Sequence, residues 1–237
     1  GWINSDDYYL PGAFTKAVRF FETHPEVDLL YGDVISINGA GEMINVMRFA
    51  NYSVEDLMTF RVISQPGVFF RRRAWDAAGG MDPAYHFLLD HHLWLRIAAQ
   101  GKIAYIPEPL AAARFYPEAK NRAHPEAFGK EAYALCDWMA EDPLFSARMK
   151  PIENHVRGGA HWLDAHYLSE GGQSALSLKQ YRKAFSLFPE RVKEDRRRVL
   201  LTLFQWASPK ASEAIFERQS AKRLKKLQSY QNLLTQQ

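Results

Sequence analysis

Strand-like patterns occur only in the first half of this 237-residue chain, and no other feature of the sequence constrains the fold as strongly. Residues 27–37, 43–47, 68–70 and 102–106 are short, largely apolar runs bounded by turn-forming residues. From about residue 125 onward, apolar residues recur at helical spacing, in the runs 126–139, 154–168 and 174–188. The sequence therefore predicts an α/β unit at residues 1–118 and an all-α extension at residues 119–237.

The first residues of the chain combine a short apolar run with two adjacent carboxylates, Asp6 and Asp7. Residues 2–5 are predicted to form a buried strand that ends there, and open α/β sheets bind ligands beyond the carboxyl ends of their strands. Two neighbouring carboxylates suit a hard divalent cation such as Mg²⁺ or Mn²⁺. An Asp-Asp pair before a turn is more often a helix cap or a solvated loop than a metal site, and both interpretations stay open at this point.

Composition excludes some classes of protein. A hydrophobic content of 47% is ample for a packed core, and a formal net charge of +3 is too small to indicate a nucleic-acid partner. The single cysteine, Cys136, rules out an internal disulfide and favours a reducing, cytoplasmic location. No apolar run approaches the roughly 18 to 20 residues that a membrane-spanning helix needs.

Several motifs, taken in order, resemble those of family 2 glycosyltransferases. The run Ile-Asn-Ser-Asp-Asp at residues 3–7 resembles the Asp-x-Asp motif of that family. Further on, the resemblance covers Gly79-Gly80-Met81-Asp82, the run Leu-Asp-His-His-Leu-Trp-Leu-Arg-Ile at residues 89–97, and residues 101–107. The match extends over roughly residues 1–120. It implies a partial GT-A fold, a Rossmann-like α/β arrangement, of which this chain carries the C-terminal half.

The resemblance also implies an activity: inverting transfer of a sugar from a nucleotide-diphosphate donor to a hydroxyl of a saccharide or lipid-linked acceptor, in the synthesis of cell-surface polysaccharide or glycoconjugate. Asp6, supported by Asp7, would hold Mg²⁺ or Mn²⁺, and Asn4 would hydrogen-bond the ribose. Asp90 would be the general base. The neighbours His91 and His92 are alternative bases, but on a helix they point about 100° and 200° away from Asp90.

Other positions carry two readings. The turn Gln65-Pro66-Gly67 would lie beside the acceptor pocket of the family, or would be an ordinary loop that leads into a strand. Arg114 would face the diphosphate or acceptor, or would pair with a surface acid. Asp33, on a hairpin edge, is either a metal ligand or a structural acid.

Two departures from the family pattern concern the site. Leu89 precedes the candidate base, where many relatives carry Glu. Arg114-Phe115-Tyr116 replaces an Arg-x-His whose His helps to hold the metal, so either metal binding would be weaker or another group such as His124 would complete the metal site. The resemblance further implies that a nucleotide-binding half precedes residue 1. We therefore expect a fragment that binds a nucleotide-sugar poorly by itself.

The C-terminal section is basic: residues 190–237 contain 11 Lys and Arg against 5 acids. Its last part, residues 211–237, is predicted to be a basic amphipathic helix. Such a helix either attaches peripherally to the inner face of an anionic cytoplasmic membrane or packs on its own domain. Two other functions stay open: a non-catalytic binding module that keeps the GT-A fold, and an interaction protein whose helical half is the working part.

Overall fold

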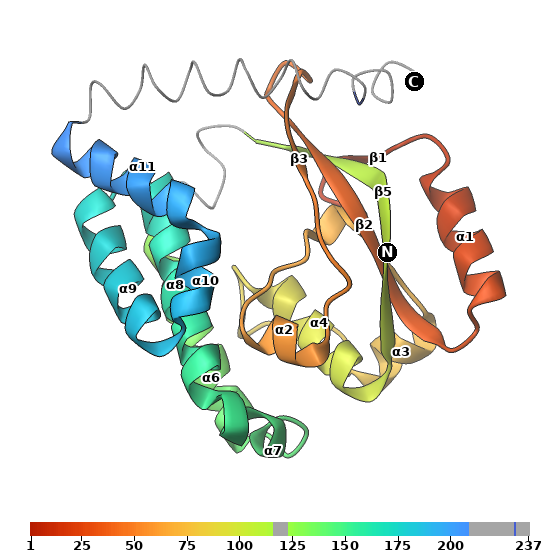
Figure 1. Cartoon of the computed structure of the whole chain (residues 1–237). Coiled ribbons are helices and arrows are strands. Elements are labelled where there is room, and N and C mark those ends of the chain that lie inside the picture. Colours follow the sequence, from red (N-terminus) through yellow and green to blue (C-terminus); the bar gives the residue numbers. More distant parts are fainter. Residues whose placement is uncertain (116–122, 209–229, 231–237) are drawn as a thin grey trace.

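The structure is a computed structural model that describes residues 1–115, 123–208 and 230. A mixed sheet with flanking helices occupies one side of the molecule, and a layer of helices from the second half of the chain covers the other (Figure 1). The described part is therefore an α/β unit followed by an all-α region, as predicted. The predicted boundary at residues 118 and 119 lies outside the described residues.

The elements follow one another with short connections. The strands are β1 (Tyr8–Tyr9), β2 (Val27–Ile37), β3 (Met43–Met47), β4 (Val68–Phe70) and β5 (Lys102–Arg114). The helices of the α/β unit are α1 (Ala13–Thr23), α2 (Val54–Met58), α3 (Arg72–Ala77) and α4 (Leu89–Gln100). The later helices are α6 (Pro125–Glu141), α7 (Ser146–Met149), α8 (Glu153–Glu170), α9 (Ser174–Leu187), α10 (Pro189–Glu194) and α11 (Arg196–Ala207). Short 3-10 turns occur at Gln65–Gly67 and Lys150–Ile152.

Within the described residues, five strands form one sheet in the order β1-β5-β2-β3, and β4 pairs with the first part of β2. The two long strands, β2 and β5, are parallel, with Tyr31 opposite Tyr105 and Ile35 opposite Ala112. The other pairings are antiparallel, including the β2–β3 hairpin across the predicted turn at residues 38–41. Because β2 and β5 run in the same direction, their carboxyl ends meet at one edge of the sheet.

The prediction of a strand at residues 2–5 is wrong. These residues take no strand conformation, and strand structure begins only at Tyr8. Residues 4–7 form a hydrogen-bonded turn, in which the Asp7 N–H donates to the Asn4 carbonyl oxygen at 3.2 Å. Asn, Ser and Asp bond readily to nearby backbone and so favour turns over strands.

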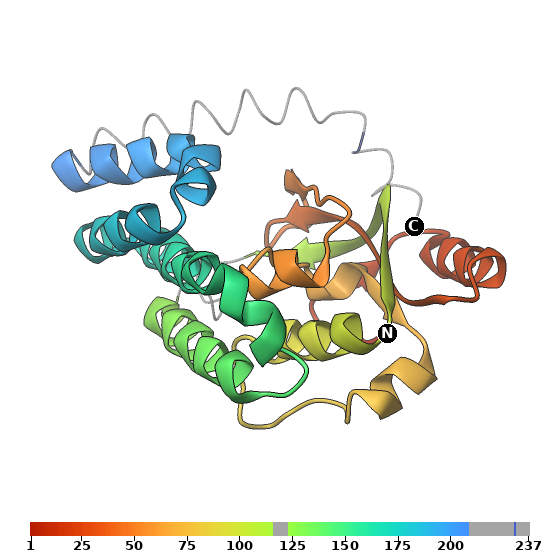
Figure 2. The same ribbon diagram turned by 60° about the horizontal axis from the view of Figure 1, so that its bottom comes forward.

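The two faces of the sheet are covered by different helices. Along β2, Leu29 and Tyr31 point into the core with α2 and α4, whereas Leu30 points to the opposite face. That opposite face packs against Ala13 and Ala17 of α1. The alternation follows from the two-residue period of a strand. In Figure 2, α1 and the helical layer lie on different sides of the sheet.

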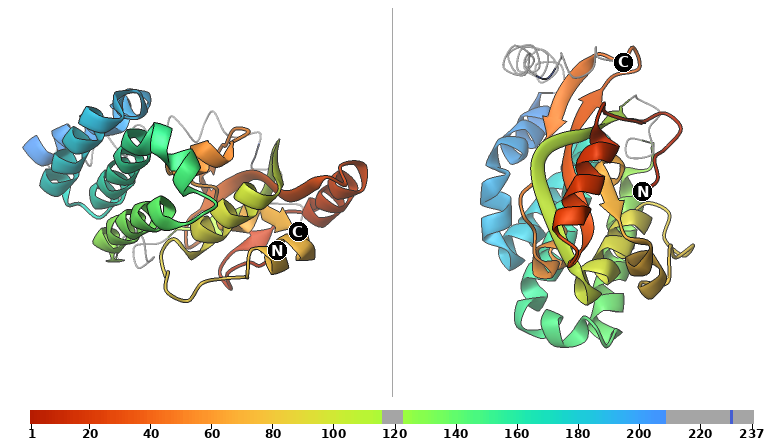
Figure 3. Two further views of the ribbon diagram at one scale, coloured as in Figure 1. Left: turned by 90° about the horizontal axis from the view of Figure 1, so that it is seen from below. Right: turned by 90° about the vertical axis from the view of Figure 1, so that its right-hand side faces the viewer.

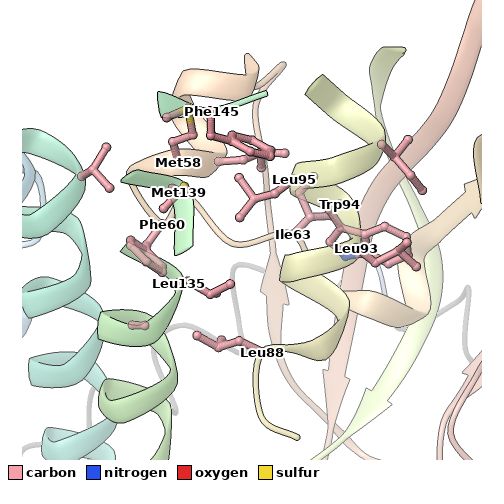
Figure 4. Packing of buried hydrophobic residues seen from close by; sticks show 14 of the residues in the cluster. Met58, Phe60, Ile63, Leu88, Leu93, Trp94, Leu95, Leu135, Met139 and Phe145 are labelled. Atoms are coloured by element: carbon pink, nitrogen blue, oxygen red, sulfur yellow. The ribbon is translucent and has the colours of Figure 1, made fainter. Parts of the chain in front are cut away.

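The main hydrophobic core joins the two halves of the chain. It contains buried side chains of α2 and α4, such as Met58 and Leu95, together with Leu135 and Met139 of α6 and Phe145. Figure 4 shows these side chains gathered between the ribbons of both halves. Further along, Val156 and Leu163 extend the same core onto α8. The helical region is thus packed into the α/β unit, and the two views in Figure 3 show it along one flank.

Local sequence signals explain where helix α2 begins and where helix α3 ends. Ser53 caps α2 with a complete capping box, in which Asp56 accepts from the Ser53 N–H at 2.9 Å. After α3 the chain turns through two glycines in the left-handed region, Gly79 and Gly80, with φ of 77° and 70°.

Two observations bear on the prediction of membrane contact. None of the helices in residues 1–115 and 123–208 combines the length and apolar character that crossing a bilayer requires. Of the predicted basic helix at residues 211–237, all except Tyr230 lie outside the described residues. The Tyr230 hydroxyl accepts a hydrogen bond from Arg48 at 3.1 Å.

Candidate active site

The acidic turn that carries Asp6 and Asp7 is fixed against the carboxyl ends of β2 and β5. The Asn4 side-chain amide donates to Asp7 Oδ2 at 3.3 Å, within the turn. Directly after the turn, β1 pairs with the last part of β5, with Tyr8 opposite Ala112. The two carboxylates therefore lie at the sheet edge where the sequence placed them, although a turn and not a strand presents them.

Arg114, the last residue of β5, ties this turn to the sheet. Its backbone N–H donates to Asp7 Oδ1 at 2.8 Å, and its Nε donates to the Asp6 carbonyl oxygen at 3.2 Å. The guanidinium Nη1 donates to the carbonyl oxygens of Asn38 and Gly39, at 3.0 and 2.9 Å, just beyond β2. The side chain acts as a clamp between the acidic turn and the hairpin. The two roles predicted for Arg114 from the sequence stay predictions.

The electrostatics of the turn suit a cation. Burial raises the pKa of the Asp7 carboxyl, and the neighbouring charge of Asp6 adds to the effect, while the Arg114 N–H opposes it. A divalent cation would relieve this repulsion between adjacent carboxylates. No group of three or more His, Cys, Asp or Glu side chains suited to a metal occurs among the described residues. Further ligands would have to come from substrate and water, as Mg²⁺ commonly allows.

Asp90 lies in the first turn of α4, where the helix dipole favours an anion. Its Oδ1 accepts the N–H of His91 at 2.7 Å. The side chain is only partly exposed, and burial raises the pKa of its carboxyl to about 6; the negative charge of Glu131 contributes in the same direction. A carboxyl with this pKa is mostly ionised at pH 7 and still basic enough to take a proton, which suits general base catalysis.

The helical region forms the wall beside Asp90. Glu131 of α6 accepts backbone N–H groups from the segment just before α4, and Phe128 of α6 packs edge-on against Phe87, with ring centroids 5.1 Å apart. Tyr167 of α8 stacks on Phe128 at 3.7 Å. Burial, together with the charges of Glu170 and Asp90, raises the pKa of the Tyr167 hydroxyl.

The two histidines that follow Asp90 point into the protein. His91 is fully buried, and its Nε2 lies 3.0 Å from the Leu57 carbonyl oxygen. His92 is 3% exposed and packs between Tyr85 and Trp138. Burial lowers the pKa of each ring to about 4, so both are neutral at pH 7. Their burial favours Asp90 over either histidine as the group that meets a substrate.

The predicted acceptor region, Gln65-Pro66-Gly67, is a buried 3-10 turn. The Gln65 side-chain amide donates to the Trp2 carbonyl oxygen, which holds the start of the chain over this turn. Asp33 is structural, since its Oδ1 accepts from the Tyr105 hydroxyl at 2.7 Å and the Phe49 N–H at 3.2 Å. The structure thus brings Asn4, Asp6, Asp7 and Arg114 together in one cluster. Asp90 lies on α4, close to side chains of α6 and α8.

Sequence reasoning missed Glu131. Its partners are residues 86–88, more than 40 positions earlier, and no local motif signals such a contact. Tyr116, at the position of the metal-binding His in the resembled family, lies outside the described residues. His124 is exposed at the start of α6, near the Phe87 ring, and its role as a metal ligand stays a prediction.

Comparison with known proteins points to sugar transfer. No protein-family model matches this chain. It is 30% identical over 127 residues to the amylovoran biosynthesis glycosyltransferase AmsE of Erwinia amylovora, covering 51% of this chain and 46% of that protein. It is 27% identical over 117 residues to an uncharacterized glycosyltransferase of Haemophilus influenzae, covering 47% and 43%. The chain spans less than half the length of these relatives, and the similarity supports a glycosyltransferase.

Proposed function

We propose that this chain carries the C-terminal half of the catalytic domain of a family 2 glycosyltransferase of the GT-A type, which transfers a sugar from a nucleotide-diphosphate donor to a hydroxyl group with inversion. The observation that carries the proposal is Asp90: a partly buried carboxyl with a pKa raised to about 6, at the start of α4. Similarity to two glycosyltransferases over about half the chain supports the same assignment.

The donor side of the site would be the acidic turn. Asp6 and Asp7 offer hard oxygen ligands, which fit Mg²⁺ or Mn²⁺, and the bound cation would neutralise charge on the leaving diphosphate. Arg114 keeps both carboxylates at the sheet edge through its bonds to the turn and to the β2–β3 hairpin. The Asn4 amide donates to Asp7, and it would also hydrogen-bond a ribose hydroxyl of the donor.

Asp90 would act on the acceptor. Its carboxylate takes the proton of the acceptor hydroxyl as that oxygen attacks the anomeric carbon. The bond between the anomeric carbon and the diphosphate oxygen breaks on the opposite side, so a single displacement inverts the configuration. With a pKa of about 6, roughly nine in ten Asp90 carboxyls are ionised at pH 7 and ready for this step.

The acceptor is inferred from the named relative. AmsE is named for amylovoran biosynthesis, and this supports a role for the present chain in polysaccharide synthesis, with a saccharide or lipid-linked acceptor. The site residues do not distinguish these two acceptors.

The test is sugar transfer by the natural gene product that carries this sequence. Release of nucleoside diphosphate is followed with a panel of nucleotide-sugars, acceptor oligosaccharides and Mn²⁺. Asp90→Asn should lower turnover by roughly 10² to 10⁴ with little loss of stability. Asp76→Asn, the same change at an exposed carboxylate on α3, is the matched control. Full activity of Asp90→Asn would remove Asp90 from the mechanism.

An interaction role is the second candidate, and one surface favours it. Helix α11 exposes Leu200 (63%), Trp206 (60%), Leu203 and Phe204, although it belongs to the helical layer. Clusters of exposed large apolar side chains commonly mark contact surfaces. Light scattering of the protein, compared with a Leu200→Lys variant, tests self-association through α11: a dimer that becomes a monomer in the variant supports this role.

A further inference from the structure

We propose that Glu131, on α6 of the helical region, is a positioning residue that fixes the start of α4 and thereby the place of Asp90. This inference rests on the proposed role of Asp90 as general base. It assigns the helical extension a part in the active site, which the sequence motifs do not include.

The geometry of Glu131 is specific. Its Oε1 accepts the N–H of His86 at 2.9 Å, and its Oε2 accepts the N–H groups of Phe87 and Leu88 at 2.9 and 2.8 Å. Three consecutive amides therefore converge on one carboxylate, as in the backbone nests that bind anions. Such charge-assisted hydrogen bonds are stronger than neutral ones, and the paired oxygens fix orientation as well as distance.

The bonded segment leads directly into α4. Leu88 is the N-terminal cap residue of that helix, and its side chain makes no capping hydrogen bond. Asp90 follows two residues later. The N–H groups at the start of a helix have no partner within the helix and fray unless another group accepts them. By accepting the amides of residues 86–88, Glu131 fixes the backbone that leads into the first turn, which carries Asp90.

Packing reinforces the same contact. Phe128 lies three residues before Glu131, and residues at this spacing share one face of a helix. That face holds Phe87 through the Phe128 ring and the backbone of residues 86–88 through the Glu131 carboxylate. Tyr167 of α8 stacks on Phe128 from behind, so the contact has support from a second helix.

Charge gives Glu131 a second effect on Asp90. The negative charge of Glu131 raises the pKa of the Asp90 carboxyl, in addition to the larger effect of burial. Removal of that charge should therefore lower the Asp90 pKa, even where the fold is retained.

The experiment measures this directly on the protein labelled with ¹³C-aspartate. The carboxyl signal of Asp90 is identified by its loss in Asp90→Asn and then titrated in Glu131→Gln. We expect the Asp90 pKa to fall, and amide hydrogen exchange at residues 86–88 to accelerate by tenfold or more. Glu141→Gln, the same change at the other end of α6, should leave both quantities unchanged. An unchanged Asp90 pKa together with unchanged exchange in Glu131→Gln would overturn the proposal.

An activity measurement separates this inference from the proposed function. In the active gene product, Glu131→Gln should shift the acidic limb of the kcat/KM profile to lower pH, by the same amount as the Asp90 pKa, and Glu131→Asp should restore part of the lost rate. If the pKa and the exchange respond while Asp90→Asn stays fully active, the positioning contact stands and the general-base role fails. If Asp90→Asn is inactive and Glu131→Gln changes neither the Asp90 pKa nor the exchange rate, the general-base role stands and the positioning contact fails.

Discussion

Acidification from pH 6 to pH 5 should destabilise the Asp90→Asn variant more steeply than the wild type. The pH dependence of stability in this range involves three titratable groups at the start of α4, and the variant lacks one of them, Asp90. Burial lowers the pKa of His91 and of His92 to about 4, from an ordinary value of 6.5. Burial raises the pKa of Asp90 to about 6, from an ordinary value of 3.8.

The two kinds of group act in opposite directions. The folded pKa of each histidine is depressed, so its contribution to stability is complete above about pH 6.5 and is lost as the pH falls toward 4. The folded pKa of Asp90 is raised, so its contribution is complete below about pH 3.8 and is lost as the pH rises through 6. Between pH 6 and 5 Asp90 therefore offsets part of the destabilisation that the histidines cause.

The magnitude follows from proton counts. At pH 5.5 the unfolded chain binds about 1.8 more protons on the two histidines, and the folded protein binds about 0.7 more on Asp90. The net difference of about one proton means that these three groups contribute about 1.4 kcal/mol per pH unit to the wild-type slope. Without Asp90 the contribution of the two histidines alone is about 2.4 kcal/mol per pH unit. Other shifted groups, such as His161 and Asp164, are present in both proteins and cancel in the comparison.

The assay is urea unfolding followed by tryptophan fluorescence at pH 6.0, 5.5 and 5.0. Asp76→Asn, at an exposed carboxylate, should keep the wild-type slope. Equal slopes for Asp90→Asn and the wild type would refute the reasoning, because Asp90 would then titrate alike in the folded and unfolded chains.

Three further outcomes are expected. Gly159→Ala should cost about 2 kcal/mol or more of unfolding free energy in urea titrations, because a Cβ there would overlap the Thr59 carbonyl oxygen. The control Gly39→Ala, in open space, should cost under about 1 kcal/mol. Equal costs for the two variants would contradict the close contact between Gly159 and Thr59. Arg114→Lys should lower the melting temperature in scanning calorimetry by several degrees, since Lys cannot bond three carbonyl oxygens in fixed directions. The whole chain should sediment with anionic vesicles at low salt through residues 211–237 and should not sediment with neutral ones; no binding to either would leave those residues a packing role.

Much of the α/β unit could be predicted from local signals. The run 27–37 and its hairpin partner carry both an apolar pattern and a Gly-containing turn, and the structure has them at the predicted residues. The strand predicted at 102–106 extends to Arg114, past Pro107 and Pro109, which lack an N–H to donate. A register shift at Gly32 and Asp33 of β2 absorbs these prolines, and a sequence pattern does not reveal such a shift.

The candidate site was predicted only in part. The motifs predicted Asp90 in the first turn of a helix, which the structure has, whereas a turn and not the predicted strand presents Asp6 and Asp7. The clamp made by Arg114 and the contact made by Glu131 depend on residues far apart in the chain. Such contacts follow from how the elements pack, which periodicity alone does not determine.

The core shared by α4, α6 and α8 has a practical consequence for engineering. Trp94 and Leu135 belong to one buried cluster, so the line between the two halves runs through the centre of the molecule. A chimera that exchanged only the helical half with a relative would place unmatched surfaces against each other. A transplant that preserves this core therefore has to exchange residues 86–100 together with residues 125–170, as one piece.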